Sequence, residues 1–360
     1  MNTVEGHRPN GRCGPGRIAA PIAAALLLWF AIACGAAQEP LTGADWEIRA
    51  LGVRDATMLA ELKELAHRRP VTIAIVGQGG VSRSLLSPML TDTTTFEYRM
   101  WPEGQPDDPA TNTHDTQAAQ VILSLTQRLG ISVRLLAYQP SESWGNVAEA
   151  LAQAGREADI VTLYQSFWGD VTAMVEAVRA SERALFVSPY VEYADYATGT
   201  SLQSHAAKPW ADGIPHFVTA IPAARSSPGE LLTPRSGSDD TEVINFVAPS
   251  YYADGPGGTC PSAEVAAAVA AYIVAASPSV PTPTEVIQLM RETSTLDREA
   301  LRGLPEFSED SLAGLAAGIM RLHDPPEGVA RKLDAPGLLS LAGVLARLTK
   351  MGDQSRPTDP

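Results

Sequence analysis

A cysteine stands where a glycine-rich turn runs into an apolar segment. Residues 257 to 261 read Gly-Gly-Thr-Cys-Pro, and an alanine-rich run continues from there to Ala276. Proline suits the first turn of a helix, so Cys260 is expected at the N-cap of a helix. The partial positive charge of a helix N-terminus favours thiolate over thiol, which makes a cysteine there a better nucleophile. The segment fits thiol chemistry, and it also fits a small buried cysteine that caps a core helix.

The surroundings of Cys260 resemble the serine motif of the subtilisin-like serine peptidases, the subtilases. That motif is Gly-Thr-Ser followed by a helix of small residues, and matching it to Gly258 through Pro278 puts Cys260 at the position of the nucleophilic serine. Residues 112 to 119 read Asn-Thr-His-Asp-Thr-Gln-Ala-Ala and resemble the subtilase segment His-Gly-Thr-His-Val-Ala-Gly. The resemblance implies that His114 is the catalytic histidine.

Further segments follow in the order that the family has. Val71 to Gly79 resembles the first core strand of subtilases, which ends Asp-Thr-Gly, and Gly77 stands at the position of the triad aspartate. The matches together cover about Trp46 to Thr295, a length typical of one large α/β domain. The residues that the resemblance implies for substrate binding are Ser166, Phe167, Trp168, Gly169, Gly258 and Thr259.

Two parts of the subtilase machinery are missing from the sequence. Gly77 has no carboxylate with which to orient His114, and loss of that acid costs a serine triad about ten-thousandfold in rate. The stretch Ala184 to Glu192 resembles the segment that carries the oxyanion-hole asparagine, but it contains no asparagine. Loss of one such donor costs roughly a hundred- to a thousandfold.

Other carboxylates are close to His114 in sequence. Asp115 follows it directly, but neighbouring residues on a helix diverge by about 100°, so Asp115 is expected to face elsewhere. Asp107 and Asp108 are expected in a solvated loop. A cysteine and a histidine can form a thiolate–imidazolium pair before substrate arrives, so a third group is less critical than in a serine enzyme.

These departures predict a pseudopeptidase, a domain of subtilase fold that binds a peptide or protein without cutting it. The alternative is an active endopeptidase in which Cys260 and His114 hydrolyse peptide bonds through a thioester acyl-enzyme. A function of another class, dinucleotide binding, is suggested by the glycines of residues 77 to 80 after a strand. It is disfavoured because Ser82 replaces the last glycine of that fingerprint and Pro88 would interrupt the helix that follows.

The elements that must position these residues alternate between strand and helix patterns. This alternation predicts a three-layer α/β/α fold with a mostly parallel sheet, and the resemblance makes it subtilisin-like. Strands are expected at residues 71–76, 131–136, 160–163, 184–187, 217–221 and 243–247. Helices are expected at residues 58–67, 115–129, 147–154, 171–180, 262–276, 284–292, 310–322 and 336–350. Polar loops at 90–113 and 193–215 are expected to build a substrate cleft.

The first residues have the pattern of a secretory signal. Three arginines precede an apolar run from Ile18 to Ala33, which is short for a membrane span. A bacterial lipoprotein cleavage box would end before Cys34, whereas a small-residue site would end at Ala37. We therefore expect a signal peptide at 1–37, a peptidase-like domain at 38–322, and a linker, helix and tail at 323–360. The expected location is extracytoplasmic: secreted, periplasmic or anchored to the cell envelope of a bacterium through Cys34.

Composition limits the partners. The chain has 360 residues, 45% of them hydrophobic, and a net charge of -14, which makes nucleic acid an improbable ligand. We expect a peptide or protein ligand, with membrane contact only through a lipid anchor. No cofactor is expected because no cysteine–histidine cluster has zinc spacing. Residues 236 to 240, Ser-Gly-Ser-Asp-Asp, are acidic enough for structural calcium, but they are expected to form a polar turn.

Overall fold

The computed structural model describes most of the chain between residues 46 and 354. The chain divides into two units, residues 1–40 and 41–360, and every described residue belongs to the second unit. The described ranges are 46–77, 79–100, 112–140, 144–163, 171–189, 213–223, 244–252, 255–256, 260–304, 307–324, 327 and 333–354.

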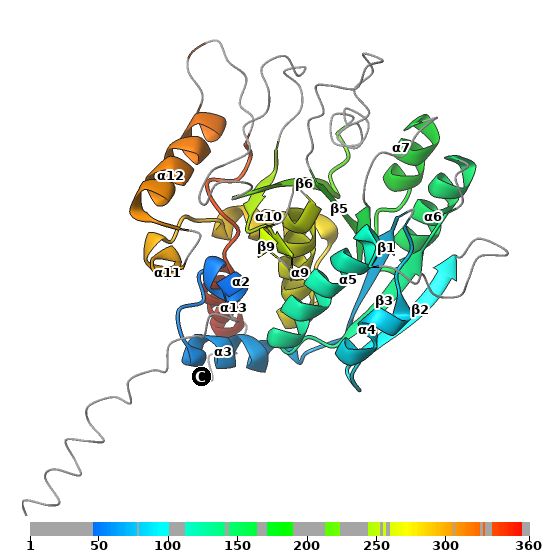
Figure 1. Ribbon diagram of the computed structural model, residues 1–360, viewed down its shortest axis with the longest axis horizontal. Coiled ribbons are helices and arrows are strands. Elements are labelled where there is room, and N and C mark those ends of the chain that lie inside the picture. Colours follow the sequence, from blue (N-terminus) through cyan, green and yellow to red (C-terminus); the bar gives the residue numbers. More distant parts are fainter. Residues whose placement is uncertain are drawn as a thin grey trace, which may run out of the picture. The chain divides into compact units, whose positions relative to one another are not determined.

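A parallel sheet of seven strands organises the second unit (Figure 1). Its spatial order is β2-β3-β1-β4-β5-β6-β7, and every neighbouring pair is parallel. Parallel neighbours need crossover connections, and helices lie in the described connections between β2 and β5. The strands are β1 (Val71–Val76), β2 (Thr94–Met100), β3 (Val133–Tyr138), β4 (Ile160–Leu163), β5 (Leu185–Pro189), β6 (Phe217–Pro222) and β7 (Phe246–Ala248).

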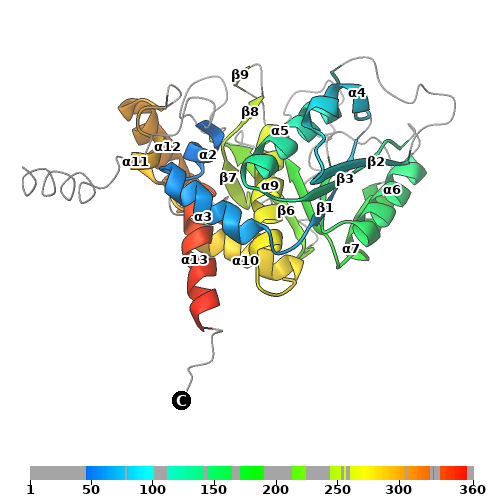
Figure 2. The same cartoon turned by 90° about the horizontal axis from the view of Figure 1, so that it is seen from below.

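The side chains of the inner strand β1 alternate between two apolar layers. Ile73 and Ile75 of β1 face a core built with helices α5 (His114–Arg128) and α9 (Cys260–Ala276). Ala74 and Val76 face a second core built with α6 (Trp144–Glu157) and α7 (Val171–Arg179). Figures 1 and 2 show α5 and α9 side by side on one face, with α6 and α7 on the other. The predicted three-layer α/β/α fold with a parallel sheet is confirmed.

Helix α9 is the centre of the first core. Every residue from Pro261 to Ala276 is buried, as expected for a helix that is apolar on all sides. It packs against α5, α10 (Pro283–Thr293) and strands β4, β5, β6 and β7. Its many alanines let the helix approach the sheet closely, and the first residue of this helix is Cys260.

The last part of the described chain packs on the same unit. Single bridges join Leu333 to Ile244 and Leu338 to Val247, so residues 333–338 run beside β7. Helix α13 (Leu341–Gln354) packs against α10, α9 and α3 (Ala56–Ala66). The remaining short or peripheral elements are α2 (Trp46–Ala50), α4 (Arg83–Leu86), η2 (Ser87–Met89), β8 (Tyr251–Tyr252), β9 (Gly255–Pro256), α11 (Arg298–Leu301) and α12 (Glu309–His323). Within the described part of the chain, no helix is both long and apolar enough to cross a membrane.

The expectation of an uninterrupted loop over residues 90–113 is wrong. Thr94–Met100 forms β2, an edge strand paired with β3. Thr94 and Phe96 are buried on either side of the exposed Thr95, but the charged residues Glu97 and Arg99 that follow weaken the apolar pattern. Helix α9 also begins at Cys260 rather than at Ser262, so Cys260 is its first residue and not its cap.

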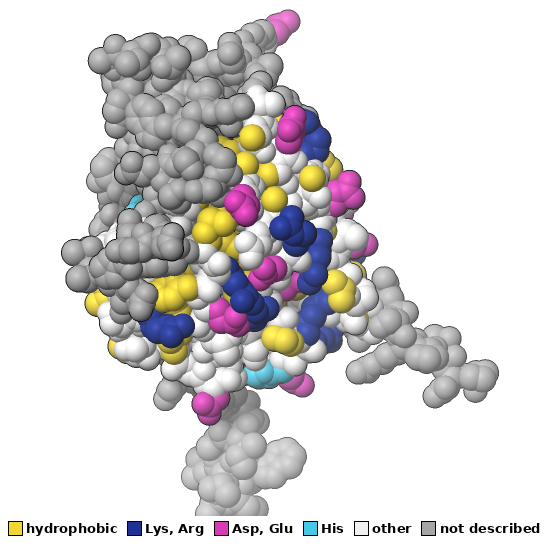
Figure 3. All heavy atoms as spheres, turned by 90° about the vertical axis from the view of Figure 1, so that its right-hand side faces the viewer, with side chains coloured by type: hydrophobic (Ala, Val, Ile, Leu, Met, Phe, Trp, Pro, Cys, Tyr) yellow, Lys and Arg dark blue, Asp and Glu magenta, His cyan; other side chains and the backbone are white. Residues whose placement is uncertain are grey.

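The edge formed by β2 carries mixed charges. Glu97 pairs with Arg134 at 2.7 Å and with Arg99 at 3.0 Å, and Arg99 also pairs with Glu157 of α6 at 3.0 Å. Figure 3 shows basic and acidic side chains interspersed over this side of the molecule. Ion pairs this exposed contribute little to stability, but charges on an edge strand discourage pairing with another chain.

Candidate functional site at the carboxyl edge of the sheet

Helices α5 and α9 both begin at the edge where the parallel strands end. The Thr113 hydroxyl, at the N-cap of α5, donates to the Gly80 carbonyl in the loop after β1 at 2.5 Å. The Ser262 hydroxyl, in the first turn of α9, donates to the Ala220 carbonyl of β6 at 3.1 Å. His114 and Cys260 are the first residues of these two helices, so the topology brings both predicted site residues to this edge.

The start of α5 is fixed by its cap. Thr113 has extended backbone, and its hydroxyl accepts from the Thr116 backbone N–H at 3.0 Å. This bond satisfies one of the N–H groups that have no partner within the helix. The His114 side chain is partly buried, 27% exposed, and its Nδ1 lies 3.6 Å from Oδ1 of Asp115.

Asp115 faces inward, which corrects the expectation that it faces elsewhere. Its carboxylate is buried, and Oδ2 accepts from the Gly80 N–H at 2.9 Å. A β-carbon built on Gly77 would lie 2.3 Å from both carboxylate oxygens, so Asp115 occupies the space beside Gly77. The 100° rule separates the Cα–Cβ directions of adjacent residues, but it does not keep the ends of their side chains apart.

The loop after β1 is held by the edge strand and by α5. The Ser82 N–H donates to the Thr116 hydroxyl at 2.8 Å. The Tyr98 hydroxyl donates to the Val81 carbonyl at 2.8 Å, and the Arg83 guanidinium lies over the Tyr98 ring at 5.4 Å. Strand β2 therefore helps to fix the loop that binds the Asp115 carboxylate.

Cys260 is partly exposed at the start of an otherwise buried helix. Its thiol is not in a disulfide within the described part of the chain. One helical turn later lies Glu264, which is fully buried. Sequence reasoning overlooked Glu264, although it is the one charged residue in the segment Cys260–Ala276 and a buried carboxylate is costly.

Among the described residues, the buried Asn245 does not replace the expected oxyanion donor. Strand β5 ends at Ser188 and Pro189, and neither is an amide side chain. Asn245 is buried before β7, where its Oδ1 accepts from the backbone N–H of Thr219 at 2.8 Å. Thr219 lies in the middle of β6, so Asn245 extends the sheet bonding rather than reaching the carboxyl edge.

Several predicted site residues lie outside the described residues. These are Cys34, Asp107, Asp108, Ser166, Phe167, Trp168, Gly169, Gly258, Thr259 and the acidic segment at 236–240. Among the residues that are described, no group of three or more His, Cys, Asp or Glu side chains is placed to hold a metal ion.

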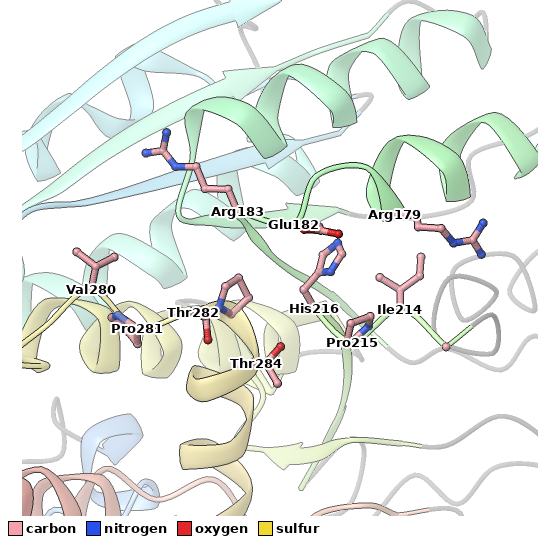
Figure 4. A pocket seen from close by; sticks show the side chains of 12 residues that line it. Arg179, Glu182, Arg183, Ile214, Pro215, His216, Val280, Pro281, Thr282 and Thr284 are labelled. Atoms are coloured by element: carbon pink, nitrogen blue, oxygen red, sulfur yellow. The ribbon is translucent and has the colours of Figure 1, made fainter.

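A pocket of about 640 Å³ lies at the opposite edge of the sheet. Its walls are the segment Val280–Thr284 between α9 and α10 and residues Gly213–His216 before β6 (Figure 4). None of the predicted catalytic residues lines it. His216 is buried there with Nε2 2.8 Å from the Val178 carbonyl, a contact that joins β6 to α7.

Comparison with known proteins gives a fold but no family. No protein-family model matches the chain, and no curated protein matches it in sequence. The crystal structure of a lanthipeptide protease is 16% identical, with a TM-score of 0.54 over 85% of this chain and 94% of that one. The PatG macrocyclase in complex with peptide is 14% identical, with a TM-score of 0.47 over 81% of this chain and 95% of that one. The unit at residues 41–360 thus has a subtilisin-like fold.

Proposed function

We propose that this domain binds peptides at the carboxyl edge of its sheet and cleaves them with Cys260 as nucleophile and His114 as base. The observation that carries the proposal is that the first residues of α5 and α9, at one edge of a subtilisin-like fold, are His114 and Cys260. A solved structure with this fold is that of a lanthipeptide protease, which supports a peptide as the substrate.

The chemistry follows from these two side chains. The Cys260 sulfur attacks the peptide carbonyl carbon, and its proton passes to His114, which delivers it to the leaving amine nitrogen as the C–N bond breaks. This forms a thioester between the enzyme and the acyl half of the substrate. Water, deprotonated by His114, then cleaves the thioester and releases a carboxylic acid, and the Cys260 thiol is restored.

A peptide-binding domain without turnover is the second candidate. The absence of an asparagine from residues 184–192 favours it, because an oxyanion donor contributes roughly a hundred- to a thousandfold in rate. In this candidate the same edge binds an extended peptide, and Cys260 acts as a packed thiol in the first turn of α9.

Turnover of a mixed peptide library by the purified chain under reducing conditions separates the two candidates. The variants are Cys260→Ala and His114→Ala, with His67→Ala as control because His67 is exposed after α3, away from the site. Cleavage that disappears in both site variants and persists in the control supports the peptidase. Retention of library peptides without cleavage, by the parent chain and both variants alike, supports the binding domain.

The first residues add a proposal about location. The arginines and the apolar run up to Ala33 support export, and Cys34 supports a lipid anchor. Intact mass of the protein purified from a bacterial host measures this: a diacylglyceryl adduct on Cys34 supports the anchor, and a chain that begins after Ala37 supports secretion.

A further inference from the structure

We propose that Asp115 is a positioning residue that replaces, from helix α5, the carboxylate that Gly77 lacks. The inference rests on the proposed function, because an orienting carboxylate matters only where His114 acts as a base. It adds to that function the third member of the machinery, at a position where the subtilase motifs have a glycine.

The two positions have exchanged residue types. In the motifs that these segments resemble, aspartate stands at the position of Gly77 and glycine follows the catalytic histidine. In this chain, glycine stands at 77 and aspartate follows His114. The structure places these two positions against each other, since a β-carbon on Gly77 would lie 2.3 Å from either carboxylate oxygen of Asp115. The exchange therefore leaves a carboxylate in nearly the same volume and supplies it from the other element.

The Asp115 carboxylate is held in a defined orientation. Oδ2 accepts from the Gly80 N–H at 2.9 Å, which leaves Oδ1 turned toward His114, 3.6 Å from Nδ1. A buried carboxylate persists where hydrogen bonds or a nearby cation compensate its lost hydration. The side chain that can become that cation is His114.

The consequence is a fixed role for each imidazole nitrogen. The 3.6 Å separation is longer than a hydrogen bond, so the carboxylate acts on the imidazole by its charge. A negative charge beside Nδ1 favours the proton on Nδ1, leaves Nε2 able to accept a proton, and favours the imidazolium that results. For a thiol nucleophile, a stabilised imidazolium increases the fraction of thiolate present before substrate binds. Asp115 therefore acts on Cys260 through His114.

Alkylation of Cys260 by iodoacetamide tests this without requiring peptide turnover. The rate is measured against pH by mass spectrometry of the peptide that contains Cys260, with the full chain folded. Asp115→Asn is expected to slow alkylation at pH 7 by about tenfold or more and to move the midpoint toward that of an ordinary thiol, about 8.5. The matched control is Asp159→Asn, because Asp159 accepts a backbone N–H from Thr72 at 2.8 Å in the same way but far from His114 in the fold.

The reciprocal exchange Gly77→Asp with Asp115→Gly supplies the second variant. It returns the carboxylate to β1 and is expected to alkylate with the pH profile of the parent chain, even where Asp115→Asn fails to fold. A parental profile in Asp115→Asn, or an equal change in Asp159→Asn, would overturn the proposal. So would an exchange variant that behaves like His114→Ala. A parent chain that shows the expected alkylation profiles but cleaves no peptide would contradict the proposed function and leave the role of Asp115 intact.

Discussion

Gly77 and Asp115 share one space at the carboxyl edge of the sheet. The carboxylate oxygens of Asp115 lie 2.3 Å from the point where a β-carbon of residue 77 would be. The backbone of Gly77 does not have the positive φ that favours glycine, so it is the carboxylate and not the turn that excludes a side chain. A glycine at 77 and an aspartate at 115 are therefore dependent on each other.

Substitution of Gly77 by alanine is expected to destabilise the fold by about 1–3 kcal/mol, the usual cost of forcing extra volume into a packed site. Asp115→Gly removes the collision, although it also removes the acceptor of the Gly80 N–H, so Gly77→Ala is expected to cost much less in the Asp115→Gly background than in the parent chain. Urea unfolding of the single and double variants measures the coupling between the two positions.

The control for this comparison is Gly314→Ala. Gly314 lies exposed in α12 with nothing within 4 Å of an added β-carbon. Alanine there is expected to raise the free energy of unfolding by about 0.5–1 kcal/mol, since glycine is a poor helix former. If Gly77→Ala does not lower the free energy of unfolding either, the Asp115 carboxylate does not occupy the space beside Gly77 in solution.

Asn245 is expected to be structural. Its Oδ1 accepts from the backbone N–H of Thr219 at 2.8 Å and from the Thr219 hydroxyl at 3.3 Å, all within the buried sheet. Asn245→Ala leaves that buried N–H without its acceptor, which costs about 1–3 kcal/mol. Chemical denaturation measures the change. The control is Gln153→Ala on α6, because the Gln153 amide donates only to the side chain of Glu157. The free energy of unfolding of this variant is expected within about 0.5 kcal/mol of the parent. Equal effects of the two variants would refute a special role for Asn245.

The Arg54–Asp297 pair predicts a pH-dependent contribution to stability. Burial alone would raise the pKa of Asp297, but the hydrogen bond from Arg54, at 2.7 Å, and backbone N–H groups of α11 hold the pKa below its usual value. A carboxylate with a lowered pKa contributes stability above its unfolded pKa, about 3.9, and loses it as the pH falls through the folded value. Arg54→Ala is therefore expected to destabilise the chain at pH 7 by up to about 1 kcal/mol, because Arg54 is half exposed.

This loss is expected to be smaller at about pH 3 than at pH 7, because at pH 3 the unfolded state has already bound a proton at Asp297 and the pH approaches the lowered pKa of the folded state. Unfolding by urea at both pH values measures it. Arg302→Ala provides a control, since the Arg302–Glu309 pair is exposed on both sides and no measurable change is expected. A deficit in Arg54→Ala that stays constant between the two pH values would contradict the assignment to Asp297.

The sequence predicted the buried strands well because each of them is a continuous run of apolar residues. Strands such as Val71–Val76 are apolar on both faces, as in parallel sheets covered on both sides, so the apolar run itself gives the bounds of β1. Strand β2 was not predicted because an edge strand carries charges on its exposed side, and Glu97 and Arg99 interrupt the apolar residues. Edge strands in general lack a regular apolar alternation, so this segment is not exceptional.

The site was predicted in part. His114 and Cys260 could be found because each stands in a motif of several residues with a fixed spacing. Asp115 could not be placed by helical geometry alone. Its carboxylate lies in the space that a side chain at position 77 would fill, and Gly77 follows β1 rather than belonging to α5. The sequence does show that aspartate and glycine have changed places between the two motifs. That exchange indicates a shared role only once the structure shows that positions 77 and 115 are in contact.

The most direct test of a thiol peptidase is the covalent intermediate itself. The chain is mixed with a peptide p-nitrophenyl ester, quenched in acid, and digested, and the peptide that contains Cys260 is examined by mass spectrometry. We predict one acyl group on Cys260, labile to neutral hydroxylamine as a thioester, formed at least about tenfold more slowly in His114→Ala and at the parental rate in His67→Ala. An unmodified Cys260 in the presence of excess ester, or acylation that does not depend on His114, would contradict the proposed function.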